Sequence, residues 1–238
     1  MTTANQQFQG VYGPYVIDDT DRREVQNYRF ALLVSGLSLL SGVLNWWLVG
    51  AQWAGIWAIP FAAGIGLALR WIHIYLKPLH QLLQLFWLLG CLGWITLIAR
   101  EGLFKSLPAL NEQPLWLLAI GPLFAALAGI GFKEFFCFQR PEAIGLTLLL
   151  PIALLGRLLG LIPGTPCLSL IGCSAALLVL LACRKFGVDA AADVGDKSVF
   201  AYLDQSQQDG LARQQDSAAS ETRGLDGNKR RIEDMQNN

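Results

Sequence analysis

Two histidines, His73 and His80, suggest ligation of a metal ion or a tetrapyrrole. Imidazole nitrogens bind transition metals, and residues seven apart share one face of a continuous helix. Pro78 lies between them and favours instead a pair that faces across a tight turn. The spacing supplies no third ligand, and two side chains at helix ends near the membrane surface are the alternative. We therefore name both as candidate cofactor-binding residues and assign no metal or other cofactor.

Arg157 lies inside an apolar run and is the candidate polar site within the membrane. An unpaired Arg at the centre of a bilayer costs about 2.5–3.5 kcal/mol on insertion scales. Counted back from Ile162, Arg157 is about one and a half helical turns from the interface, so its side chain can reach the headgroups. Pairing with Glu101 or Glu112 in a polar cavity is the alternative.

A charged and aromatic stretch, 131–142, separates two apolar runs. It contains the neighbours Lys133 and Glu134, followed by Arg140 and Glu142 around Pro141, a residue that suits the first turn of a helix. These four charged residues are candidate contacts with a partner protein. Anchoring of two helix ends at the membrane surface is the alternative interpretation.

Sequence signatures of catalysis are missing from the chain. We find no Ser-His-Asp set, no His-Glu-x-x-His, no paired intramembrane carboxylates and no Gly-x-x-x-x-Gly-Lys phosphate loop. The five cysteines form no Cys-x-x-Cys pair and lie in or beside apolar runs, which is typical of packed thiols. We therefore expect no enzymatic activity.

The composition is that of an integral membrane protein. Hydrophobic residues make up 53% of the chain and charged residues 15%, against roughly 25% charged in soluble domains. The formal net charge of zero argues against nucleic acid as a partner, and membrane lipids are the expected surroundings. The segment before Phe30 is polar and acidic, unlike the start of a cleavable signal peptide, so we expect the first apolar run to be retained.

Six apolar runs are long enough to cross a bilayer as helices. The sequence therefore predicts an all-α, polytopic bundle of about six transmembrane helices, with the first helix starting at Asp21 and Glu24 in capping-box spacing. Tryptophans flank the break at 50–52, and prolines interrupt three spans. The predicted spans are 30–49, 53–75, 79–99, 115–132, 143–162 and 167–183.

The chain divides by composition into four regions. We predict an N-terminal cytoplasmic segment (1–29), a transmembrane domain (30–183), a juxtamembrane segment that docks (184–203) and a disordered tail (204–238) with little to bury. Nine basic residues flank the spans on one side and two on the other. Because basic residues concentrate in cytoplasmic loops, both termini are expected in the cytoplasm.

Small residues within the spans let helices approach closely, as in Gly156-x-x-x-Gly160. Six helices offer many internal partners, so this motif favours packing inside the bundle over dimerisation. The oligomeric state stays open.

Several motifs occur together and carry a resemblance to a known family. They are Gly13-Pro-Tyr-Val-Ile, Asp21-Arg-Arg-Glu-Val, Ile72-His-Ile-Tyr-Leu-Lys-Pro-Leu-His80, Phe132-Lys-Glu with Phe136-Cys-Phe138, and Gly195-Asp-Lys-Ser-Val-Phe-Ala-Tyr-Leu203. In this combination, over about residues 10–203, the chain resembles an uncharacterised family of integral membrane proteins from cyanobacteria, classed as a domain of unknown function. The resemblance implies a thylakoid or plasma membrane and supplies no catalytic residues.

Three functions are compatible with these observations. The first is a non-catalytic accessory or assembly factor for a larger membrane complex, suggested by the charge-poor bundle and the segment at Gly195–Leu203. The second is a small transporter or channel for a neutral solute, suggested by the Pro- and Gly-interrupted spans. The third is a metal- or tetrapyrrole-binding membrane protein that uses His73 and His80.

Overall fold

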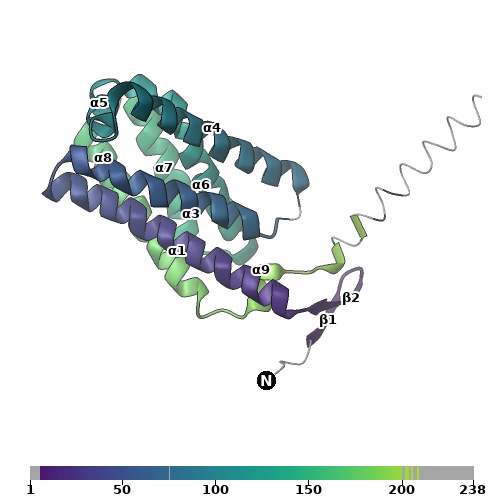
Figure 1. Cartoon of the computed structure of the whole chain (residues 1–238). Helices are drawn as coiled ribbons and strands as arrows, with labels where there is room; N and C mark the ends of the chain where they lie inside the picture. Colours follow the sequence, from purple (N-terminus) through teal and green to yellow (C-terminus); the bar gives the residue numbers. More distant parts are fainter. Residues whose placement is uncertain (1–5, 75, 200–201, 204, 206–207, 209–238) are drawn as a thin grey trace, which may run out of the picture. The chain divides into compact units, whose positions relative to one another are not determined.

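The chain divides into two compact units, each considered by itself. The helical unit spans Asp18–Val194, and the terminal unit joins Met1–Ile17 with Gly195–Asn238. The computed structural model describes residues 6–74, 76–199, 202–203, 205 and 208 (Figure 1). The predicted disorder of Asp204–Asn238 lies almost wholly outside these residues.

The helical unit contains six helices that are long and apolar enough to cross a membrane. This confirms the predicted number of spans and the all-α class. Ala51–Trp71 and Pro114–Phe138 each combine short helical pieces into one span. The elements are α1 Asp19–Leu48, α2 Ala51–Ala54, η1 Gly55–Trp57, α3 Ala58–Trp71, α4 Lys77–Glu101, α5 Ser106–Glu112, η2 Pro114–Trp116, α6 Leu117–Phe138, α7 Pro141–Leu158, α8 Gly164–Lys185 and α9 Ala190–Val194.

Helix α1 begins earlier than predicted. Its N-cap is Asp18, whose side chain accepts from the backbone N–H of Asp21 (2.9 Å), while the Asp21 side chain accepts from the Asp18 N–H (3.0 Å). The capping box therefore lies three residues before the predicted pair of Asp21 and Glu24, which was wrong. At 1.5 Å per residue α1 is about 45 Å long, longer than a hydrocarbon core of about 30 Å.

Two connections are more ordered than the sequence indicated. The stretch 100–114 lacks an obvious hydrophobic period, yet it contains helix α5. Between α6 and α7, Gln139 adopts a left-handed conformation (φ 50°) and caps α6 through its N–H to the Phe135 carbonyl. Helix α7 then starts at Pro141, as predicted.

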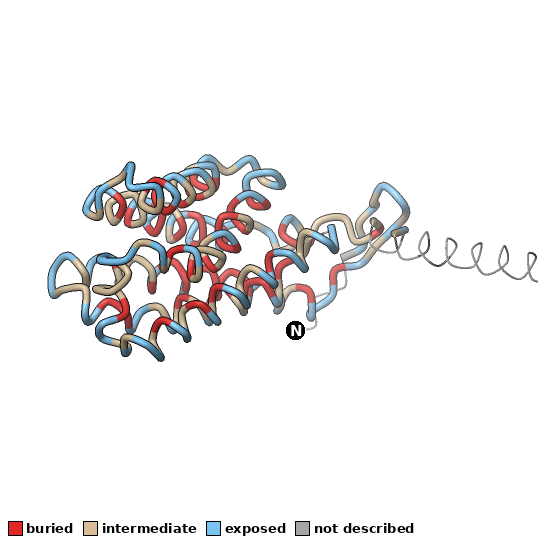
Figure 2. Tube along the Cα trace, turned by 90° about the horizontal axis from the view of Figure 1, so that it is seen from above, coloured by how far each residue is buried: buried red, intermediate tan, exposed pale blue. Residues whose placement is uncertain are grey.

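The core of the helical unit forms where neighbouring helices pack together. Helix α1 packs on α3 and α8, α4 on α6, and α7 on α6 and α8. In Figure 2 the buried positions lie on the sides of the helices that face one another. Gly90 and Gly93 allow the close approach of α4 to α6, since a Cβ at either position would overlap Leu123 or Ala119.

The terminal unit contains a β-hairpin that the sequence analysis missed. Strands β1 (Gln6–Gly10) and β2 (Gly13–Ile17) pair antiparallel, with the rings of Phe8 and Tyr15 stacked at 5.6 Å. The other end of the chain is bonded to the hairpin turn. The N–H of Val11 donates to Asp196 Oδ2 (2.7 Å), and the N–H of Tyr12 donates to Ser198 Oγ (3.0 Å).

Candidate functional site

A buried network of charged residues lies where α1 begins and where α6 and α8 end. Because the spans alternate in direction, the first turns of α1 and the last turns of α6 and α8 lie at the same end of the bundle. The network consists of Arg29, Lys133, Glu134, Lys185 and Asp193, each exposed by no more than 7%. We refer to these five residues as the ion-pair network.

Glu134 is the centre of the ion-pair network and is fully buried. Its Oε1 accepts from the Tyr28 hydroxyl (2.7 Å) and from the Lys133 ammonium (3.2 Å). Its Oε2 accepts from the Lys185 ammonium at 2.6 Å. Both carboxylate oxygens are therefore satisfied by donors from three helices, which offsets the desolvation of the charge.

Asp193 brings the short helix α9 into the network. Its Oδ2 accepts from Arg29 Nε at 2.7 Å, and its Oδ1 accepts from Lys185 Nζ. Arg29 also donates to the backbone carbonyl of Asp189, just before α9 (3.3 Å). Lys185 is consequently shared between two carboxylates, and it links α6, α8 and α9.

Two aromatic rings complete the surroundings of the lysines. The Lys185 Nζ lies 4.4 Å from the centroid of Phe138 and 5.3 Å from that of Tyr28. The Lys133 Nζ lies 5.1 Å and 5.6 Å from the same two rings. Ring faces attract cations, most strongly when water is excluded, so the rings stabilise both ammonium groups.

Counted by formal charge, the network holds three cations and two carboxylates. All five groups are within hydrogen-bonding distance of a partner in the same chain. Removing one member of a buried ion pair leaves an uncompensated charge and is strongly destabilising. The arrangement is therefore suited to holding helix ends together.

A second charged group lies beside the network. Glu142, 4% exposed in the first turn of α7, accepts from Arg184 (3.0 Å) and lies 4.0 Å from Arg140. The structure thus directs Lys133, Glu134 and Glu142 into the chain. Contact of these residues and Arg140 with a partner protein stays a prediction.

The partners of Glu134 were missed by the sequence analysis. Tyr28 and Arg29 looked like membrane-surface residues, and Lys185 was counted only as a basic flank. Asp193 lies in a segment with no recognisable motif. The available signal was the combination of several charges just outside apolar runs at one end of the bundle, which an ion-pair network can bury.

The two candidate cofactor ligands have separate protein partners. His80 Nε2 lies 2.7 Å from the backbone carbonyl of Leu69, and so His80 links α4 to the last turn of α3. His73 Nε2 lies 3.6 Å from a carboxylate oxygen of Glu24. Within the described residues, no group of three or more His, Cys, Asp or Glu side chains is placed to hold a metal ion. Cofactor binding by the two histidines stays a prediction.

Arg157 lies near the end of α7 and contacts the connection between α4 and α6. Its Nη2 donates to the backbone carbonyl of Asn111 (2.7 Å) and lies 3.5 Å from the Asn111 side-chain oxygen. This contact is neither of the predicted pairings with Glu101 or Glu112. Arg157 thereby joins α7 to α5, and it lines a cavity.

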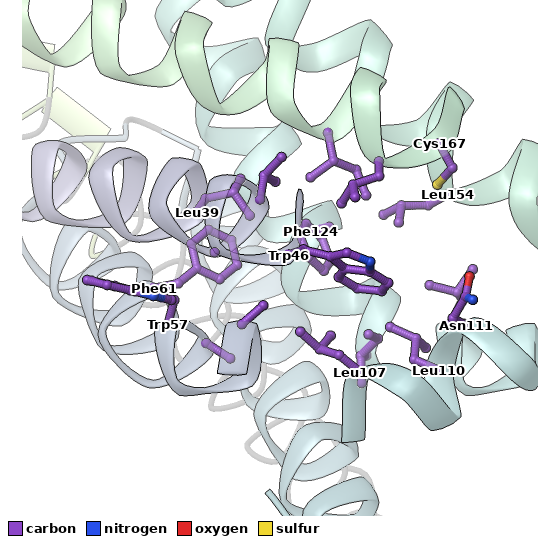
Figure 3. A pocket seen from close by; sticks show the side chains of 18 of the residues that line it. Leu39, Trp46, Trp57, Phe61, Leu107, Leu110, Asn111, Phe124, Leu154 and Cys167 are labelled. Atoms are coloured by element: carbon purple, nitrogen blue, oxygen red, sulfur yellow. The ribbon is translucent and has the colours of Figure 1, made fainter. Parts of the chain in front are cut away.

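The apolar cavity lies at the end of the helical unit opposite the ion-pair network, with a volume of 140 Å³. Figure 3 shows Trp46 from α1, Phe61 from α3, Phe124 from α6 and Leu154 from α7 around it, with Asn111 on one side. The sequence analysis placed the tryptophans at the membrane surface and did not predict a cavity. Its remaining lining residues include Trp57, Trp94, Leu107, Leu110 and Cys167.

Comparison with known proteins agrees with this architecture. Residues 67–202, more than half of the chain, match the family model described as uncharacterized integral membrane protein (DUF2301). The matched region includes Lys133, Glu134, Lys185 and Asp193. No curated protein and no solved structure matched the chain. The resemblance seen in the sequence is confirmed, and the chain belongs to this family of integral membrane proteins.

Proposed function

We propose that the protein is a non-catalytic accessory protein that binds a partner in a larger membrane complex through its terminal unit. The observation that supports this proposal is the folded structure formed by the two ends of the chain. Asp196 binds the N–H of Val11, and the rings of Tyr12 and Tyr202 stack at 4.1 Å. Two isolated strands are only marginally stable in water, so these contacts help to hold the hairpin in a fixed shape.

The hairpin presents features that proteins use for recognition. Its turn exposes Val11 (82%) and Tyr12 (53%), and in the described residues each strand pairs with one neighbour only. Unpaired strand edges can accept a strand from another protein, and exposed apolar side chains beside them add specificity. A partner with an extended segment is the binding mode that these features favour.

Sidedness also fits an assembly role. The bond between Val11 and Asp196 requires both chain ends on one side of the membrane, which an even number of spans provides. The basic residues favour the cytoplasmic side, and we propose that the terminal unit lies there.

Affinity purification from the native membrane in mild detergent tests this function. We expect a reproducible set of proteins with the wild-type chain, and loss of that set with Tyr12→Ser, which removes an exposed ring. The matched control is Phe104→Ser, which removes a similarly exposed ring (47%) from the helical unit. Repeated recovery of the wild-type chain alone would refute the proposal.

A second candidate function is passage of a neutral solute, and the apolar cavity favours it. Its walls come from α1, α3, α4, α6, α7 and α8, so movements between spans could change access to it. Flux of small uncharged solutes into liposomes measures this directly. Rates equal to those of empty vesicles would exclude it for the solutes tested.

A further inference from the structure

We propose that the apolar cavity is a binding site for a small, neutral ring compound that carries one hydrogen-bond acceptor. The inference names the ligand class of the cavity used in the transport proposal. Binding needs neither passage across the membrane nor a partner protein. It is measured apart from flux, so failure of transport would leave the site standing.

The size of the cavity limits the ligand. An apolar protein cavity of about 150 Å³ is large enough to bind benzene. The volume of 140 Å³ is close to that value, so a single ring with one or two substituent atoms fits, whereas a larger body does not.

The walls of the cavity select a neutral and mainly apolar body. Trp46, Trp57, Phe61 and Phe124 supply aromatic surface, and leucines supply most of the remainder (Figure 3). Ring compounds gain from stacked or edge contacts with such side chains in addition to apolar burial. A charged ligand would lose its hydration without an opposing buried carboxylate in the lining.

One polar group in the wall has no partner. Trp94 of α4 lines the cavity, and its indole nitrogen is buried without a hydrogen bond. An indole N–H is a donor only, and a buried donor without an acceptor is costly. An acceptor on the bound ring would supply the missing bond. Ser38 and Cys167, which also line the cavity, already donate to the backbone carbonyls of Val34 and Ala153.

The chain provides a matched control for this nitrogen. Trp87 lies seven residues earlier on α4, and its indole N–H donates to the carbonyl of Ala62 at 2.8 Å. It does not belong to the cavity lining. Substitution of either residue by Phe removes one indole from the same helix, but only Trp94→Phe removes the unpaired donor.

The test compares two probes of equal size, cyclohexanone and methylenecyclohexane, which differ in an oxygen and a CH₂ group. Their dissociation constants are measured by saturation-transfer NMR with the purified full-length protein in deuterated detergent. We use the ratio of the two constants in each variant, because partition into the micelle then cancels between variants.

We expect Trp94→Phe to reduce the preference for cyclohexanone by about two- to tenfold, the range of one net hydrogen bond. Trp87→Phe should leave the ratio unchanged. Ala54→Leu, which adds three carbon atoms to the lining, should weaken binding of both probes. If Trp94→Phe fails to fold, the tryptophan isostere benzothienylalanine at position 94 removes the N–H while keeping the ring.

Two results would overturn the proposal. A ratio that is equal in the wild type and without the Trp94 N–H would show a cavity that takes any apolar body, such as a lipid acyl chain. Binding of both probes that is unaffected by Ala54→Leu would place them outside the cavity.

Discussion

The ammonium nitrogen of Lys185 lies 2.6 Å from Glu134 Oε2 and also donates to Asp193 Oδ1, so one side chain at the end of α8 links α6 to α9. These three residues are 3%, 0% and 3% exposed in their side chains. The ion-pair network therefore fixes the ends of helices that are far apart in sequence.

The first prediction concerns the charge of Glu134. Glu134→Gln leaves the buried ammonium groups of Lys133 and Lys185 without one of their counter-charges. Breaking a buried pair in this way costs about 3–5 kcal/mol, so we expect a markedly lower melting temperature of the purified protein in detergent. The control is Glu112→Gln, at an exposed carboxylate, which should change stability little. Equal melting temperatures for the two variants would contradict the role of Glu134.

The second prediction concerns helix α9. Asp193→Asn weakens the contacts with Arg29 and Lys185, which hold this five-residue helix on the bundle. We expect faster hydrogen exchange of the amides in α9, while the middle of α8 keeps its protection. Asp193→Glu, which retains the charge, should exchange more slowly than Asp193→Asn. Unchanged exchange in α9 after Asp193→Asn would show that other contacts hold it.

Much of this architecture could be predicted from the sequence, because apolar length determines a span almost by itself. The six runs and the helix start at Pro141 were found in this way. The hairpin was not, since its strands are short and its turn, Val11-Tyr12, carries none of the usual Gly or Asn signals.

The partners of Glu134 were harder to predict, for a different reason. Tyr28, Lys185 and Asp193 lie 106, 51 and 59 positions from it in the chain, and only the packing of the helices brings them together. The cavity likewise depends on residues from six spans. Helix α5 was missed because it is short and lacks a clear apolar period.

The third prediction is a dependence on pH in the terminal unit. Hydrogen bonds from the Ser198 hydroxyl and from the Val11 N–H hold the pKa of Asp196 below its ordinary value. A lowered pKa in the folded state means that the carboxylate stabilises the fold above its unfolded pKa, and that this contribution is lost as the pH falls through the folded pKa. Exchange of the Val11 amide should therefore accelerate in acid.

Two variants check the assignment to Asp196. Asp196→Asn should remove the acid-dependent step in Val11 exchange. Ser198→Ala should move that step to higher pH, because it removes the largest cause of the lowered pKa, although it also removes the acceptor for Tyr12. An acid step that persists in Asp196→Asn would assign it to another group.

The fourth prediction concerns Arg157 and the order of α5. Arg157→Leu removes the donor to the Asn111 carbonyl, a contact expected to contribute about 1–3 kcal/mol for a charged donor. We expect faster amide exchange in Ser106–Glu112 with little change in α7. Arg100→Leu is the control, since Arg100 lies over the Trp116 ring (5.9 Å) and does not line the cavity. If α5 exchanges at the wild-type rate in Arg157→Leu, the contact is dispensable.

The most direct measurement for the accessory role is photo-crosslinking in the native membrane from two equally exposed positions. Val11 in the terminal unit is 82% exposed, and Leu48 at the end of α1 is 81% exposed. With benzoylphenylalanine at each position, we expect discrete protein adducts from position 11, identifiable by mass spectrometry, and none of these from position 48. Failure to form adducts from position 11, or the same adducts from both positions, would contradict a partner bound at the terminal unit.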